Sequence, residues 1–467
     1  MKKFEHLNDS NLSNSKYIYL KKDNQIEFDD FNYNVKSKFE IDNHSLGILM
    51  DSGVVPSPKT LFKNLYLLNY GDKIYFNPKD DSVLDKSEFL YFRDKSKQNR
   101  LSIVEFEKIL TNAVRKCIPS ENKSILFLSG GKDSASIACA LKEAELSDNC
   151  ICITYRSKKQ DETLVAKKIT KKLGISHQIL DINSYKIEPK IIESFFSGQL
   201  LPSLDLCSTL YLHCNLIDHA GSTLIDGMGN DIYMGHIPTR KEHMSAFASE
   251  IIPNWLKSFM SLFHRINSAF MIGSKTRSEM VGMWSFLTSS KLVDELLPYN
   301  VRREFWREID EKNKSFNYID LRASMRGRYI DQEKFIRKIK NAASYYGLRL
   351  ALPWMDKDLT EYCFNLSNDE LYDSDSLTNK ILIRKYLSKK LDINYFNEPK
   401  YTFSYNYSQF VKDNIEFISD LILTNSLFDR KKTSTIFQRA LKFKNYGFIY
   451  QLFLLLGWHT FSLYIKK

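Results

Sequence analysis

The sequence has no uninterrupted apolar run long enough for a membrane-spanning helix, which needs about 20 consecutive apolar residues. Four polar residues break the one stretch that comes close, Phe448 to Ile465: Gln451, His459, Thr460 and Ser462. We therefore expect a buried helix near the C-terminus. The start of the chain, Met1-Lys2-Lys3 followed by a polar segment, also lacks the apolar core of a signal peptide. Neither feature favours a membrane partner.

Cysteine is scarce and odd in number. The seven cysteines are Cys117, Cys139, Cys150, Cys152, Cys207, Cys214 and Cys363. Because most of them lie in apolar segments and one must remain unpaired, reduced thiols are favoured over a disulfide framework. We expect a cytoplasmic protein.

The positive charge of the chain is not concentrated in an arginine-rich run or in a cluster of interleaved basic and aromatic residues. The net charge of +11, from 67 basic and 56 acidic residues, fits an anion-handling protein as well as a nucleic-acid-binding one. Without such a cluster we expect no nucleic-acid partner. With 467 residues, 43% of them hydrophobic, the chain can form two or three globular domains.

The most informative stretch that is present runs from Ser124 to Ser134. The apolar run Ile125 to Leu128 predicts a buried strand, and the glycine pair Gly130-Gly131 separates it from a helix-like segment. Glycines let backbone N–H groups and the helix N-terminus face an anion, although a glycine pair alone fits a turn without a ligand equally well. Ser129 and Ser134 add hydroxyl donors, and Asp133 adds a carboxylate suited to Mg²⁺.

A second loop follows the predicted strand Thr223 to Ile225. It contains Asp226, Gly227, Met228, Gly229 and Asp231. Strands alternate with helices through this region, which predicts a doubly wound parallel sheet with its ligand-binding edge at the carboxyl ends of the strands. We expect Asp231 and Asp133 to meet at that edge and to hold Mg²⁺ on triphosphate oxygens.

Several strings in this chain are similar to those of known enzymes. Ser-Gly-Gly-x-Asp-Ser at 129–134 resembles the pyrophosphate loop of ATP pyrophosphatases, and the ending of a Walker P-loop is missing. From Leu46 to the end, the chain resembles the synthetase part of asparagine synthetases, which are related to β-lactam synthetases and lasso-peptide cyclases. The strings that carry this resemblance are 53–62, 226–231, 353–356, 379–384 and 398–403.

The resemblance implies an α/β fold of the adenine nucleotide α-hydrolase type with a large helical C-terminal part. It also implies an ATP-dependent, AMP-forming carbon–nitrogen ligase that activates a carboxylate as an acyl-adenylate and transfers it to ammonia or an amine. ATP and Mg²⁺ are the implied cofactors, with Asp133 and Asp231 as metal ligands and Lys400 as the catalytic lysine. The implied ATP and pyrophosphate contacts are Ser129, Gly130, Gly131, Asp133, Ser134, Gly227, Gly229 and Lys380.

This sequence departs from the family pattern in three places. The residues before Leu46 are too few for a glutaminase domain, so we expect a separate glutaminase, free ammonia or a substrate amine. Met228 replaces the usual acid or tyrosine, and we expect Asp226 to substitute as the base. Basic or neutral residues at 340–341 and 349–351 replace charged family residues, which predicts an acidic acceptor other than aspartate, such as a peptide or a sugar acid.

Two further groups of charged residues have uncertain roles. Asp161 fits a nucleotide or loop contact and fits equally well an acidic pair at a helix N-terminus. The segment from Tyr329 to Tyr346 carries a row of basic residues for which we expect a solvated helix face. These residues are Lys334, Arg337, Lys338 and Lys340.

We expect a short N-terminal segment at residues 1–45, a linker with β-structure at 46–100 and a synthetase-like domain at 101–467. The nucleotide-binding core of that domain would cover 120–240 and its helical part 241–467. One alternative is a catalytically inactive relative that acts as a binding subunit, which the loss of the usual base at Met228 favours. A tRNA-thiolating or lysidine-forming enzyme is disfavoured, because paired catalytic cysteines and an RNA-binding module are missing.

Overall fold

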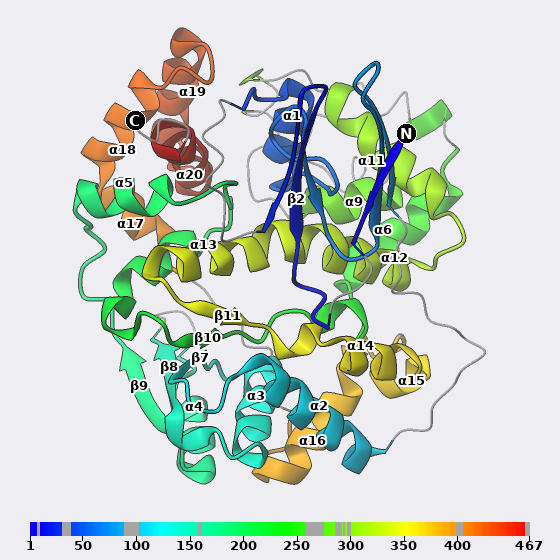
Figure 1. Cartoon of the computed structure of the whole chain (residues 1–467), viewed down its shortest axis with the longest axis vertical. Helices are drawn as coiled ribbons and strands as arrows, with labels where there is room; N and C mark the ends of the chain where they lie inside the picture. The colour runs from blue at the N-terminus through cyan, green and yellow to red at the C-terminus, as the bar shows by residue number, and fades with distance from the viewer. Residues whose placement is uncertain are drawn as a thin grey trace.

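The protein is α/β, with a five-stranded parallel sheet at its centre (Figure 1). The computed structural model describes residues 1–6, 10–29, 39–87, 102–156, 161–253, 255–257, 275–284, 292, 295–296, 300–397 and 405–462. In spatial order, the strands of the parallel sheet are β11 (Arg349–Ala351), β10 (Thr223–Ile225), β7 (Ser124–Phe127), β8 (Cys150–Tyr155) and β9 (Ser176–Leu180). The predicted doubly wound sheet is confirmed.

The order of these strands places a switch point between β7 and β10. From β7 the chain winds outward to β8 and β9, and it then returns to the other side of β7 to form β10 and β11. Ile125 pairs with Leu224 on one side and with Ile151 on the other, and β7 and β10 end within one residue of each other. Loops that leave neighbouring strands at such a reversal diverge and leave a crevice for a ligand.

Alternating residues of β7 contribute to the cores on the two faces of the sheet. Leu126 joins the core under the helices on one face, and Ile125 joins the core on the opposite face, as the two-residue period of a strand requires. The helices on the first face are α2 (Ile103–Cys117), α3 (Lys132–Glu143), α4 (Thr163–Leu173) and α16 (Ile381–Leu391). On the second face, Ile339 and Tyr346 of α13 (Arg337–Tyr346) pack against the sheet.

The N-terminal part forms two three-stranded antiparallel sheets, ordered β1-β5-β6 and β3-β2-β4. Because β2 pairs with β4, the predicted segments 1–45 and 46–100 share one sheet. In Figure 1 these strands lie on the side of α13 away from the parallel sheet. The elements are β1 (Lys2–Glu5), β2 (Lys16–Lys21), β3 (Asn24–Asp29), α1 (Asn43–Ser52), β4 (Leu65–Leu68), β5 (Asp72–Asn77) and β6 (Ser82–Ser87).

The apolar C-terminal stretch is a buried helix, as expected. Helix α20 (Tyr446–Ser462) is enclosed by α5 (Pro189–Ser197), α17 (Tyr407–Asp413), α18 (Ile415–Thr424) and α19 (Arg430–Lys442). Phe448, Phe453 and Trp458 of α20 are each fully buried. Among the described residues, no helix is both long and apolar enough to cross a membrane.

The region between β10 and α16 is mainly helical. Its elements are α6 (Arg240–Ile251), α9 (Arg277–Trp284), α11 (Asn300–Lys312), α12 (Tyr318–Met325), a π-helix (Arg326–Ile336), α14 (Lys357–Phe364), α15 (Asn368–Leu371), β12 (Tyr372–Asp373) and β13 (Thr378–Asn379). The π-helix runs directly into α13. Extended π-helical geometry is rare and is found most often near functional sites.

The expected solvated basic face on the π-helix and α13 is wrong. Lys334 and Arg337 are each 4% exposed and Lys340 is 7% exposed. The N-terminal part covers one side of this helix: Lys340 Nζ donates to Ser13 O at 3.0 Å, and the Arg337 guanidinium lies over the ring of Tyr17 in β2. Because the covering strands are distant in sequence, the local pattern of lysines and arginines could not reveal this burial.

Candidate active site

The Ser-Gly-Gly loop is braced by its own hydroxyl groups. The backbone N–H of Ser129 donates to Ser134 Oγ at 3.1 Å, and the N–H of Gly131 donates to Ser129 Oγ, also at 3.1 Å. Helix α3 begins at Lys132, directly after this turn. The loop therefore presents a helix N-terminus and two serine hydroxyls at the carboxyl end of β7, an arrangement suited to an anion.

A buried glutamate supports the loop from β8's side of the sheet. The N–H of Gly130 donates to Glu162 Oε2 at 2.9 Å, and Glu162 is 5% exposed. Burial raises the pKa of Glu162, and the hydrogen bond from Gly130 offsets this only in part. The neighbouring Asp161 lies just before the N-cap of α4 and accepts from Thr163 N at 2.9 Å. Sequence reasoning considered Asp161 as a loop contact and missed Glu162. The available signal was that Glu162 directly follows Asp161 as the second acid of a pair.

The second loop approaches the first through its glycines. A Cβ atom at Gly227 would lie 3.0 Å from the backbone N of Ser134, so a side chain there would push the two loops apart. Gly229 has a φ of 117°, which favours glycine, and a Cβ atom there would overlap Met355. Gly227 therefore lets the loop after β10 pack on the start of α3, and Gly229 lets it pack on Met355.

Asp133 and Asp231, which follow the two neighbouring strands, are brought together by a single lysine. Lys380 Nζ lies 2.6 Å from Asp133 Oδ2, 2.8 Å from Asp231 Oδ1 and 2.9 Å from Asn230 Oδ1. Asn230 also donates through Nδ2 to Asp133 Oδ1 at 2.7 Å. The predicted meeting of the two aspartates is thus found, with Lys380 between them.

The charges in this cluster stabilise one another. Burial alone would raise the pKa of Asp231, but Lys380 and His236 outweigh it and hold the pKa well below its usual range. Burial alone would lower the pKa of Lys380, but Asp133 and Asp231 raise it above its ordinary value. Asp231 and Lys380 therefore carry their charges at neutral pH.

The match to known proteins agrees with this geometry. The family model described as asparagine synthase matches residues 105–460. The chain belongs to the asparagine synthase family. A comparison with curated proteins gives no match. The family consists of ATP-dependent synthetases that form amide bonds, and its matched region contains the parallel sheet, both loops and Lys380.

The residues at the edge of the sheet fit the Mg²⁺ that the asparagine synthase family implies. Asp133 and Asp231 each direct a carboxylate oxygen at the same cationic group, the ammonium of Lys380. Mg²⁺ prefers such hard oxygen ligands and usually combines one or two carboxylates with substrate phosphates and waters. No group of three or more acidic, histidine or cysteine side chains that could hold a metal is found within the described ranges. Two protein carboxylates suit a metal that arrives with a nucleotide.

Asp226 directly follows β10, where Lys338 acts on it electrostatically. Its Oδ1 atom accepts from Met228 N at 2.9 Å, and burial raises its pKa to about 6 although Lys338 opposes the shift. Lys338 Nζ is 2.9 Å from Asp205 Oδ1. Burial, with a smaller contribution from nearby cations, lowers the pKa of Lys334 to about 8. Lys338 of α13 therefore places a cation within electrostatic reach of Asp226 at the sheet edge.

Trp354 is a further site residue, and sequence reasoning missed it. Its indole Nε1 donates to the backbone carbonyl of Asp133 at 3.2 Å, which fixes the first turn of α3. The signal was the Pro-Trp-Met-Asp string at 353–356, which follows β11 at the same edge of the sheet. Lys400 lies outside the described residues, so its predicted catalytic role stays a prediction.

Lys340 and Arg349, which suggested a changed acceptor pocket, lie in two different parts of the structure. Lys340 donates to Ser13 O and Ser15 Oγ in the N-terminal part. Arg349 is exposed at the first residue of β11, at the end of the strand away from the loops. Lys338, by contrast, acts electrostatically on Asp226 at the edge of the sheet.

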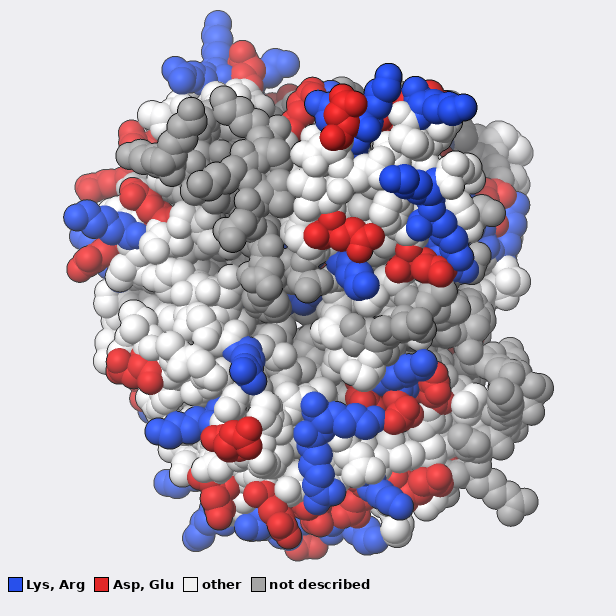
Figure 2. Space-filling view, viewed as in Figure 1, with Lys and Arg blue, Asp and Glu red and all other residues white. Residues whose placement is uncertain are grey.

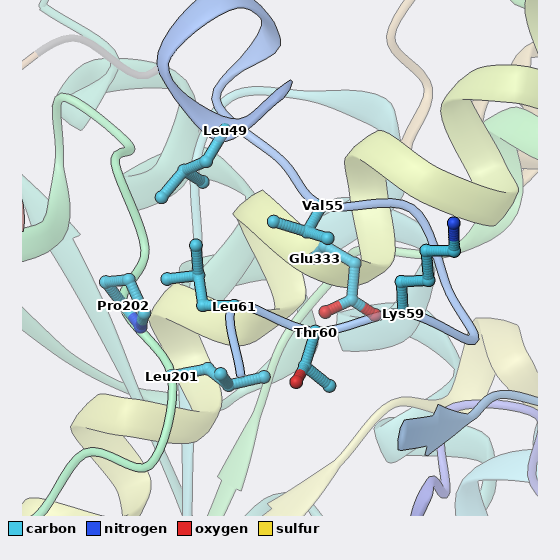
Figure 3. A pocket seen from close by; sticks show the side chains of 8 residues that line it. All are labelled: Leu49, Val55, Lys59, Thr60, Leu61, Leu201, Pro202 and Glu333. Carbon is cyan, nitrogen blue, oxygen red and sulfur yellow. The ribbon is translucent and has the colours of Figure 1, made fainter. Parts of the chain in front are cut away.

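A small cavity lies apart from this cluster (Figure 3). Its volume of about 20 Å³ has room for about one water molecule. None of the predicted site residues lines it. The residues that line it are Leu49, Val55, Lys59, Thr60, Leu61, Leu201, Pro202 and Glu333. On the face shown in Figure 2, lysines and arginines are interspersed with acidic residues.

Proposed function

We propose that the protein activates a substrate carboxylate with ATP and joins it to ammonia or an amine. The observation that supports this most strongly is the meeting of Asp133, Asp231 and Lys380 at the switch point of the sheet. A doubly wound sheet binds nucleotides at this place. The asparagine synthase family supplies the reaction class.

The reaction has two steps. The carboxylate oxygen attacks the α-phosphorus of ATP, the bond to the β-phosphate oxygen breaks, and pyrophosphate leaves. The nitrogen nucleophile then attacks the carbonyl carbon of the acyl-adenylate, the carbon–oxygen bond to AMP breaks, and an amide forms. The nitrogen loses a proton during the second step, so a base within reach of it is needed.

The chain offers groups for the first step. Ser129, Ser134 and the start of α3 bind phosphate oxygens, with Gly227 and Gly229 allowing the second loop to approach them. Bound magnesium would offset the charge of the phosphates. Lys380 donates to the leaving pyrophosphate, because a compact ammonium stabilises the charge that develops there.

Asp226 is the proposed base for the second step. With a pKa of about 6 it is mainly ionised at neutral pH and still basic enough to accept a proton. Its place after β10 puts it on the same edge of the sheet as the phosphate loop. Met228, which stands at the position of the usual acid or tyrosine in the asparagine synthase family, offers no such acceptor.

The buried lysines support an acidic acceptor other than aspartate. Lys334 is 4% exposed, and Ser203 Oγ donates to its backbone carbonyl at 2.7 Å, which fixes this turn of the π-helix beside the Asp205 loop. Lys338, one turn further, electrostatically influences both Asp205 and Asp226. Cations in this position favour a substrate that carries negative charge beyond the carboxylate to be activated.

A second candidate is a binding subunit without catalysis, which the replacement at Met228 favours. Exchange of labelled pyrophosphate into ATP, measured across a panel of amino acids, acidic peptides and sugar acids, distinguishes the two. We expect exchange with at least one acidic acceptor, and a loss of about a hundredfold or more in Asp133→Asn. The exposed Lys385→Met on α16 is the matched control and keeps the wild-type rate.

A folded chain that binds ATP but exchanges pyrophosphate with no acid in the panel would contradict the ligase proposal and support the binding subunit. Normal exchange with aspartate would contradict the proposed acceptor alone. The nitrogen source is then identified by supplying ammonia or amines to the active acid and measuring AMP release.

A further inference from the structure

Lys380 occupies the place that a divalent cation needs. Its ammonium contacts one oxygen of Asp133 and one of Asp231 at 2.6 and 2.8 Å, and a third oxygen from Asn230 at 2.9 Å. These carboxylates are the metal ligands in the proposed function. A divalent ion bound between the same oxygens would lie within a few ångströms of the ammonium, where like charges repel strongly.

The lysine is held in this place by its surroundings. Lys380 has a φ of 58°, in the left-handed region that non-glycine residues seldom adopt, and it stands at the N-terminal cap of α16. The preceding residue, Asn379, donates through Nδ2 to Gly235 O at 3.2 Å. Sparsely populated backbone conformations of this kind persist where the surrounding structure enforces them, and they cluster at functional sites.

The two aspartates need a counter-charge whenever nucleotide is absent. Asp133 and Asp231 both bind the same ammonium, and Asn230 links Lys380 to Asp133 by accepting from the first and donating to the second. Without a cation between them, two carboxylates this close would repel each other. Lys380 supplies that cation within the chain.

We propose that Lys380 is a resident counter-ion that closes the metal site until a nucleotide arrives, so that divalent cations enter only together with ATP. The proposal rests on the proposed function, because it takes Asp133 and Asp231 as ligands of the nucleotide-bound metal. When ATP is bound, its phosphates give the ammonium a second set of acceptor oxygens. Lys380 can then leave the carboxylates without remaining an unpaired buried charge.

The test measures Mn²⁺ binding to the full-length chain without nucleotide. The electron paramagnetic resonance signal of free Mn²⁺ reports how much of the ion remains unbound. We expect wild type and the exposed control Lys385→Met to bind Mn²⁺ weakly alone and to bind one ion in the presence of α,β-methylene ATP. Lys380→Met should bind Mn²⁺ without nucleotide at least about tenfold more tightly than wild type, because the competing charge is gone. Adding Asp231→Asn to Lys380→Met should abolish that gain.

Equal Mn²⁺ affinities for wild type and Lys380→Met, or tight binding of Mn²⁺ alone by wild type, would overturn the proposal. Lys380→Gln, which keeps a polar side chain, serves as the second variant if the methionine variant does not fold, with the same expected gain. The ligase proposal is tested separately. If the wild type exchanges no pyrophosphate, the ligase proposal fails while the Mn²⁺ measurement still stands. If exchange is normal but Lys380→Met and wild type bind Mn²⁺ equally, only the counter-ion proposal fails.

Discussion

Glu162 accepts a hydrogen bond from the backbone N–H of Gly130 across 2.9 Å, and this contact joins the start of α4 to the Ser-Gly-Gly loop. A buried carboxylate thus holds the first glycine of the loop in place. Because the residues are 32 apart in sequence, the contact depends on the packing of α3 and α4 over the sheet.

Replacing Glu162 with alanine should loosen the loop. The variant leaves the Gly130 N–H without its buried partner, which costs about 1–3 kcal/mol in the free energy of unfolding. We also expect the KM for ATP to rise, measured in the pyrophosphate exchange assay. Asp161→Asn is the control, since the asparagine oxygen can also accept from Thr163 N and the variant should leave both values nearly unchanged. Equal effects of the two variants would contradict a role for Glu162 in the loop.

The glycine at 229 should tolerate no side chain. Gly229→Ala combines a φ of 117° with overlap against Met355, so we expect a loss of about 1–3 kcal/mol or more in chemical denaturation. Gly174→Ala is matched in its positive φ of 68° but has nothing within 4 Å of the added Cβ atom. It should cost only about 1 kcal/mol. A Gly229 variant as stable as the Gly174 variant would contradict the close packing of the second loop on Met355.

The raised pKa of Asp226 predicts a pH dependence of stability with a definite sign. Burial raises this pKa from 3.8 in the unfolded chain to about 6, so the folded state binds the proton more tightly. The free energy of unfolding therefore falls as Asp226 ionises between about pH 4 and pH 6, and this loss persists above pH 6. Asp226→Asn should be on the order of 1–3 kcal/mol more stable than wild type at pH 7.5 and equal to it below pH 4. Urea denaturation at both pH values checks this.

The same titration should appear in catalysis. If Asp226 is the base, kcat for amide formation rises with pH through about 6 and then levels off. The Asp226→Asn variant should lose most amide formation yet keep pyrophosphate exchange, because adenylation precedes the base-dependent step. A variant with undiminished amide formation would exclude Asp226 as the base.

Removing Lys338 should affect both the free energy of unfolding and the pH dependence of kcat for amide formation. Lys338→Met leaves Asp205 buried without its ion-pair partner at 2.9 Å, which is expected to cost about 3–5 kcal/mol. Lys338 also lowers the pKa of Asp226, so the rise of kcat should shift to higher pH in the variant. Lys389→Met, exposed on α16, is the control for loss of a lysine charge. An unshifted pH profile in a folded Lys338 variant would contradict its influence on Asp226.

The sequence by itself determined the local elements of the site. The apolar run before Ser129 made a strand, Gly130 and Gly131 made the turn, and the strands that alternate with helices made a doubly wound sheet. The meeting of Asp133 with Asp231 could also be predicted, because both follow parallel strands whose carboxyl ends share one edge. These features depend on backbone propensities and on periodicity within short stretches.

Only the tertiary structure decided which side chains meet across the site. Lys380 reaches Asp133 over 247 positions and Trp354 reaches it over 221. Lys340, which the sequence suggested was solvated, is covered by the N-terminal part through Ser13. Local patterns record which residue types favour a strand, a turn or a helix, but a pairing over such separations depends on the order of the strands and on how the helices pack. For that reason the position of Lys380 between the two aspartates, from which we infer the control of metal entry, became visible only in the folded chain.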